Sequence, residues 1–207
     1  MLDLELAEAH EVAHVHNGKI NDLVLALAAG GLRALLVRRG EPVEGVWLHA
    51  SVAVSLREPG SAMDAGNRTG GIVVRLPAGE PDLRRRIRMV AAESREAKGH
   101  QLNTGGNRML VWFARVGLLR LFSRHQHMVN VVESNVAGPP ATVHVLGARV
   151  LDLVPIGSLV GNVGLSFLAI SYAGRLTITV QGDARRFPDL GTVTAAMTAE
   201  WTTLTSA

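Results

Sequence analysis

The sequence of 207 residues contains no cysteine, one tyrosine and only 4% aromatic residues. The absence of cysteine excludes a disulfide framework, a Cys-based zinc site and catalysis by a thiol, and it fits a reducing compartment. With 47% apolar residues, the chain is expected to fold rather than remain disordered. Because aromatic side chains are so few, its core must be built mostly from Leu, Val and Ala.

Lysine is also rare, since Lys19 and Lys98 are the only two among the 21 cationic residues and the rest are arginine. The arginines are scattered, apart from the run at 84–86, and no aromatic residues interleave with them. A nucleic-acid footprint needs a clustered basic stripe, so the net charge of +3 does not predict a nucleic-acid partner. The N-terminus opens with acidic residues rather than a basic flank and an apolar run, which predicts no signal peptide.

Residues 153–174 carry no charge and are numerous enough to span a bilayer. However, Pro155, Gly157 and Gly161 interrupt the first half of this stretch, and its second half alternates as a strand does. The pattern therefore favours a loop followed by a strand over a transmembrane helix.

Hydrophobic periodicity predicts one α/β domain over residues 1–207, with helices packed on a mixed β-sheet. The expected helices cover 3–16, 23–39, 81–100, 109–127 and 190–204. The expected strands cover 46–56, 71–76, 130–136, 142–151, 166–172 and 175–182. Ala173-Gly174 separates the last two strands and indicates a tight hairpin turn.

The segment His10-Glu11-Val12-Ala13-His14 matches the H-E-x-x-H pattern of zinc peptidases. On a helix the two histidines would share one face, and Glu11 could act as a general base on a metal-bound water. A metzincin also needs a glycine three residues after His14 and a third metal ligand three residues further on, and Asn17 and Ile20 stand at those positions instead. A chance match on a surface helix is the favoured interpretation, and a zinc peptidase remains a third alternative.

Two other polar segments have complete structural interpretations. Asn21-Asp22 stands directly before an apolar helical segment and is expected to serve as its N-cap pair. Ser134-Asn135 and Gly138-Pro139 are expected to end a strand and form a turn.

Four segments together resemble one family in its own order along the chain. They are "INDLVLALAAGGLRALLVRRGE" (20–41), "AGNRTGGIVVRLP" (65–77), "VVESNVAGPP" (131–140) and "LSFLAISYAGRLTITVQGDARRFPDL" (165–190). The resemblance is to the C-terminal half of bacterial wax ester synthase/diacylglycerol acyltransferases, in the chloramphenicol acetyltransferase-like superfamily. The chain departs from the family pattern at Ala137, where Pro is usual, and at Ala173, where Asp is usual.

The resemblance implies one half of a two-half fold that encloses a substrate tunnel. The general base of the family belongs to a His-His-x-x-x-Asp-Gly motif in the N-terminal half, and this chain contains no His-His pair. No catalytic residue is therefore expected here, and the isolated chain is expected to be inactive. The residues expected to line the active site are Asn21, Asp22, Ser134, Asn135, Gly138 and Pro139.

The implied reaction is the attack of an acceptor hydroxyl on acyl-CoA, which yields triacylglycerol or wax ester. Acyl-CoA is then a substrate and no cofactor is expected. The expected partners are an N-terminal half, on the same or another polypeptide, and diacylglycerol or a long-chain alcohol. The expected location is the cytoplasm, with a peripheral contact to the inner membrane face or lipid bodies left open. A non-enzymatic lipid-binding or assembly half-domain is the second alternative.

Overall fold

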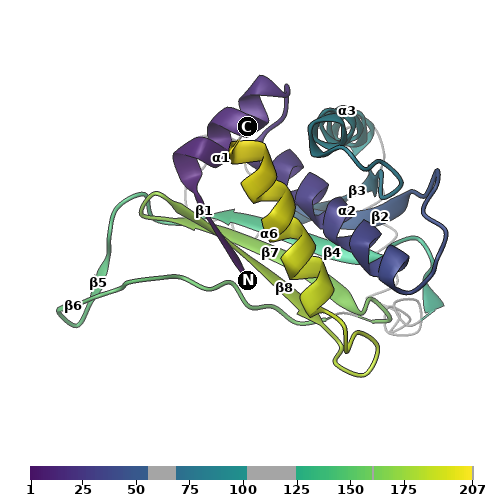
Figure 1. Cartoon of the computed structure of the whole chain (residues 1–207). Helices are drawn as coiled ribbons and strands as arrows, with labels where there is room; N and C mark the ends of the chain where they lie inside the picture. The colour runs from purple at the N-terminus through teal and green to yellow at the C-terminus, as the bar shows by residue number, and fades with distance from the viewer. Residues whose placement is uncertain (56–68, 102–124, 160, 207) are drawn as a thin grey trace.

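A computed structural model describes residues 1–55, 69–101, 125–159 and 161–206, and it has helices on one side of a mixed six-stranded sheet (Figure 1). The strand order is β1-β8-β7-β4-β2-β3. The strands are β1 (Leu2–Glu5), β2 (Leu48–Ser55), β3 (Thr69–Leu76), β4 (Val131–Ala137), β7 (Leu165–Tyr172) and β8 (Arg175–Gly182). The helices are α1 (Leu6–Val15), α2 (Ile20–Arg38), α3 (Leu83–Gln101) and α6 (Gly191–Thr205). The central strand β4 runs parallel to β2 and β7, while the other pairs are antiparallel, which confirms the expected fold class.

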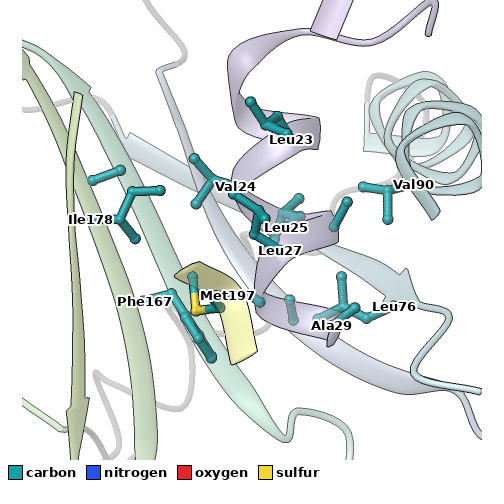
Figure 2. Packing of buried hydrophobic residues seen from close by; sticks show 14 of the residues in the cluster. Leu23, Val24, Leu25, Leu27, Ala29, Leu76, Val90, Phe167, Ile178 and Met197 are labelled. Atoms are coloured by element: carbon teal, nitrogen blue, oxygen red, sulfur yellow. The ribbon is translucent and has the colours of Figure 1, made fainter. Parts of the chain in front are cut away.

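The long apolar helix α2 lies on the sheet between α3 and α6 (Figure 1). Every residue from Asp22 to Leu32 is buried, as expected for a helix that is apolar on all sides. Figure 2 shows its side chains meeting Phe167 and Ile178 from the sheet and Met197 from α6. Among the described residues, α2 is the one helix whose length and composition would let it cross a membrane, and 67% of its most apolar window is buried inside the fold. We interpret it as the central core helix.

A buried ion pair joins the two helices that flank α2. Arg86 of α3 is fully buried, and its Nη2 lies 2.6 Å from Oε2 of Glu200 on α6. The pair crosses α2 at Gly30, where an added Cβ would lie 1.9 Å from Arg86 Nη1 and 2.2 Å from Glu200 Oε2. At the next residue, Gly31, a Cβ would lie 2.9 Å from the main-chain oxygen of Val193. The two glycines thus leave the space in which α3 and α6 approach α2.

Gly30→Ala should therefore destabilise the fold. The new methyl group would displace the buried guanidinium and carboxylate, and overpacking of this kind costs about 1–3 kcal/mol. The matched control is Gly99→Ala on α3, where an added Cβ meets no atom within 4 Å. That change should be neutral or stabilising by up to ~1 kcal/mol, because alanine favours helix more than glycine does. Urea denaturation measures both, and equal effects would contradict the packing argument.

The segment from 138 to 159 crosses the sheet face that lies opposite the helices. Leu165, Phe167 and Ala169 of β7 point into the helix-side core, so Leu168 and Tyr172 face the other way. The Tyr172 hydroxyl donates to the Val150 oxygen at 2.8 Å and accepts from the Val143 N–H at 3.0 Å. The Gly157 N–H donates to Gln181 Oε1 of β8 at 2.8 Å. These bonds fasten an otherwise extended segment, which we call the arm (138–159), to the open face.

The strand expected over 142–151 was wrong. The structure has only the two-residue strands β5 (His144–Val145) and β6 (Ala148–Arg149), which pair with each other in a hairpin directed away from the main sheet (Figure 1). Although residues 142–151 have a strand-like sequence, no strand of the main sheet pairs with them among the described residues.

The helix expected over 3–16 was wrong at its start. Leu2 and Leu4 are buried and alternate with exposed Asp3 and Glu5, and this period of two forms β1 against β8. Residues 153–174 contain no helix in their described part, which agrees with the loop and strand interpretation. The hairpin turn is confirmed at Ala173-Gly174, with φ of 45° and 86°. The helix expected over 109–127 lies almost entirely outside the described residues.

Candidate active-site wall

The helix α2 begins before the expected N-cap pair, so the expectation that Asn21-Asp22 precedes the helix was wrong. The helix begins at Ile20, Lys19 is the N-cap, and Asp22 is the third helical residue. Asp22 still caps the helix, because its Oδ2 accepts the Lys19 N–H at 2.8 Å while its own N–H donates to the Lys19 oxygen. Asn21, by contrast, has a partly exposed side chain at the first turn. The pair is thus divided into a buried capping carboxylate and an amide that solvent can reach.

Glu133 of β4 lies beside this first turn and is fully buried. Burial and, to a smaller extent, the negative charge of Asp22 raise the pKa of the Glu133 carboxyl to about 8, even though Asn21 and Lys98 act to lower it. Although the Asn21 side chain approaches the carboxyl, neither Glu133 oxygen has a partner at full hydrogen-bond geometry, and Asp22 Oδ1 has none either. Two acidic groups therefore meet in the interior at the start of α2.

Sequence analysis did not single out Glu133. It stands in the segment Val131-Val132-Glu133, where an acidic residue interrupts an apolar run of the central strand. Buried acids are rare unless they are paired, so this interruption is the signal that could have identified it.

The remaining candidates follow along β4. Ser134 and Asn135 are partly buried, and by strand alternation Asn135 points to the same side of the sheet as Glu133 while Ser134 points to the opposite side. The Gly138 N–H donates to the main-chain oxygen of Ser171 at 3.0 Å, and the main-chain oxygen of Pro139 accepts the Ala173 N–H at 3.1 Å. An added Cβ at Gly138 would lie 2.3 Å from the Ser171 oxygen. Gly138 and Pro139 therefore join the end of β4 to the β7–β8 hairpin through the main chain.

The H-E-x-x-H segment occupies the solvent side of α1. His10, Glu11 and His14 are exposed, while Ala9 and Ala13 form the buried side of this helix. Within the described part of the chain, no three His, Cys, Asp or Glu side chains are grouped so that they could hold a metal ion. The zinc peptidase interpretation thus gains no third ligand from the described residues.

Solved structures identify the class of fold. The chain is similar to the wax ester synthase/diacylglycerol acyltransferase from Marinobacter aquaeolei VT8, with a TM-score of 0.71 and 20% identity over 96% of this chain and 46% of that one. It is also similar to the PapA2 acyl transferase, with a TM-score of 0.60 and 15% identity over 96% of this chain and 43% of that one. The chain thus has the fold of somewhat less than half of each of these two acyltransferases.

The family follows from the sequence match. The family model of the WS/DGAT C-terminal domain matches residues 65–205, so the chain belongs to this family. Two relatives from Mycobacterium tuberculosis carry the name diacylglycerol O-acyltransferase. One is 31% identical over 197 residues, or 90% of this chain and 39% of the relative, and the other is 33% identical over 208 residues, or 96% and 44%. The chain therefore spans less than half the length of these curated relatives.

The capping bond of Asp22 can be tested on this chain. Asp22→Ala removes the acceptor of the Lys19 N–H and should lower the free energy of unfolding by roughly 1 kcal/mol. Asp22→Asn keeps an oxygen acceptor at the same place, so it should lose less. Urea denaturation of both variants at pH 6 measures the difference. Equal losses would mean that the capping bond contributes nothing.

Proposed function

We propose that this chain is the C-terminal half of an acyl-CoA-dependent O-acyltransferase that makes triacylglycerol or wax ester. Membership of the WS/DGAT C-terminal domain family supports the proposal, as do the names of its relatives. The observation that carries it is the coverage, because 96% of the chain matches only 46% of a two-domain acyltransferase. The reaction would need the other half of such an enzyme.

In this proposal the acceptor hydroxyl attacks the thioester carbonyl directly, and a histidine of the N-terminal half removes the hydroxyl proton. The ester C–O bond forms as the thioester C–S bond breaks, and coenzyme A leaves as the thiol after taking that proton from the histidine. This chain would supply the wall of the tunnel. The first turn of α2 offers the positive end of a long helix, which favours developing negative charge nearby. Because Asp22 is buried and Asn21 is partly exposed, Asn21 is the residue that would reach a substrate, and Asp22 would hold it in place.

Ser134, Asn135, Gly138 and Pro139 would continue the same wall along β4 and its following turn. The parallel strand β4 ends here, and the carboxyl ends of parallel strands are where ligands bind in open α/β sheets. The products are apolar lipids, so the proposal includes a cytoplasmic protein that meets a membrane face or lipid body peripherally.

The arm supports an N-terminal half as the partner. Its exposed apolar side chains are Val145, Leu146, Leu151, Val154, Ile156 and Leu159. Ile156, for example, is 77% exposed. Apolar side chains gathered on one extended segment are typical of an interaction surface, and the family's other half is the partner that this surface would meet.

The division of labour predicts an inactive chain that regains activity on reconstitution. The purified 207-residue chain should show no turnover of acyl-CoA with diacylglycerol or a long-chain alcohol. Mixing it with an N-terminal half that carries His-His-x-x-x-Asp-Gly should restore turnover, and replacing the second histidine of that half with alanine should lower turnover by about 10²–10⁴-fold.

Product formation from radiolabelled acyl-CoA measures the reaction. Robust turnover by the chain alone would overturn the assignment of the base to the other half. Lipid binding without turnover after reconstitution would favour the non-enzymatic half-domain instead.

The partner surface predicts a separate effect on association. Leu151→Asn with Ile156→Asn should weaken binding to the N-terminal half by roughly tenfold or more, because burying each side chain contributes about 1.5–3 kcal/mol. The control is Val37→Asn, another exposed apolar residue, which lies near the end of α2 and away from the arm. Calorimetric titration measures the affinities. Equal affinities for the two variants would remove the arm from the interface.

A further inference from the structure

Glu133 lies on a central strand of the sheet, and among the described residues no cationic side chain forms an ion pair with it. Its register partners are Val52 on β2 and Phe167 on β7, so both neighbouring strands present apolar side chains to it. Both of its carboxyl oxygens are buried without a full hydrogen-bond partner, and the same is true of Asp22 Oδ1. The Asn21 side chain approaches the Glu133 carboxyl, but these three acceptor oxygens near the start of α2 have no hydrogen bond of full geometry and still need a donor. A single proton on one carboxyl group supplies that donor at the lowest cost, because two charged carboxylates would repel each other away from water.

We propose that Glu133 is a positioning residue whose protonated carboxyl group donates a hydrogen bond to Oδ1 of Asp22. Oδ2 of Asp22 already accepts the Lys19 N–H, so Asp22 is held through both oxygens. This arrangement fixes the first turn of α2 against β4 and sets the direction of the Asn21 side chain. The effect on catalysis rests on the proposed function, whereas the hydrogen bond itself is a property of this chain.

The charges around Glu133 support a retained proton. Asp22 on α2 is a like charge that raises the pKa of Glu133, and Lys98 on α3 is an opposite charge that lowers it. Burial is the largest influence and acts in the same direction as Asp22, so together they outweigh the lowering by Asn21 and Lys98. The resulting pKa of about 8 keeps the carboxyl group protonated at neutral pH. Above that pH the proton is lost, the bond to Asp22 is broken, and the two carboxylates repel each other.

This arrangement gives stability a definite dependence on pH. The ordinary pKa of a glutamate in an unfolded chain is near 4.5 and the folded value is about 8, so between these values the folded state binds one more proton than the unfolded state. The contribution of Glu133 to stability therefore decreases as the pH rises through that window. An ionised, ion-paired glutamate would give the opposite trend.

The first test uses infrared spectroscopy and thermal unfolding of the whole chain. At pH 6.5, the wild type should show a protonated carboxyl band that disappears in Glu133→Gln. Its melting temperature should fall between pH 5 and pH 8 more steeply than that of Glu133→Gln, which keeps a donor but does not titrate. Glu11→Gln, at an exposed position on α1, is the matched control and should keep the wild-type pH dependence.

An absent band, or equal pH dependence of wild type and Glu133→Gln, would overturn the proposal. Stabilisation of the wild type by added Ca²⁺ or Na⁺ at constant ionic strength would do the same, since a cation rather than a proton would then join the carboxylates.

The second test separates positioning from simple packing. Glu133→Val fits the apolar strand but cannot donate to Asp22, so it should lower turnover of the reconstituted enzyme on the order of tenfold or more while the chain stays folded. Glu133→Gln should recover most of that loss because its amide can donate. If both variants lose turnover equally, Glu133 does not act through a donated bond. A failed reconstitution with an intact carboxyl band would instead count against the proposed function alone.

Discussion

The burial of α2 between the sheet, α3 and α6 is the constraint on which the rest of the structure depends. The residues from Asp22 to Leu32 are all buried. The sheet, α3 and α6 can pack closely against this stretch only where small residues of α2 leave room for them. Gly30 and Gly31 provide that space, and the ion pair between Arg86 and Glu200 closes over it. The same burial takes the first turn of the helix into the protein. Its unpaired main-chain groups must then be satisfied by protein side chains rather than water, and Asp22 does this for the Lys19 N–H.

The fully buried Glu133 and the partly buried Glu200, both close to α2, illustrate different solutions to one electrostatic problem. Burial raises the pKa of both Glu200 and Glu133. Arg86 lies against Glu200 and lowers its pKa in part, so that carboxylate is stabilised as an ion pair. Glu133 has only Lys98 as an opposing charge and has Asp22 as a like charge, so a proton takes the place of the cation. The ion pair of Arg86 and Glu200 thus lies along the middle of α2. Glu133 and Asp22 lie at the start of the helix, which faces the proposed site.

The two faces of the sheet divide the chain into a folding side and an interaction side. The helices cover one face and bury the main apolar cluster, whereas the arm crosses the other face and keeps several apolar side chains exposed. The arm is fastened at Tyr172 and Gln181 by side-chain to main-chain hydrogen bonds rather than by a packed core. This arrangement fits the proposed function, in which one side of the half-fold supports itself and the other side packs against an N-terminal half.

The sequence by itself determined the elements whose signal is local. The continuous apolar run predicted a buried α2, and the Ala173-Gly174 pair predicted the hairpin, because composition and turn geometry act over a few residues. The four family segments predicted the half-fold for the same reason, since each is a short, recognisable pattern.

The roles that depend on distant partners followed only from the tertiary structure. Leu2 and Leu4 form a strand because β8 is available to pair with them, while His144 and Val145 gain no such partner in the described sheet. Glu133 acquires its proton from its position beneath the start of α2, more than a hundred residues away along the chain, and no local pattern encodes that contact.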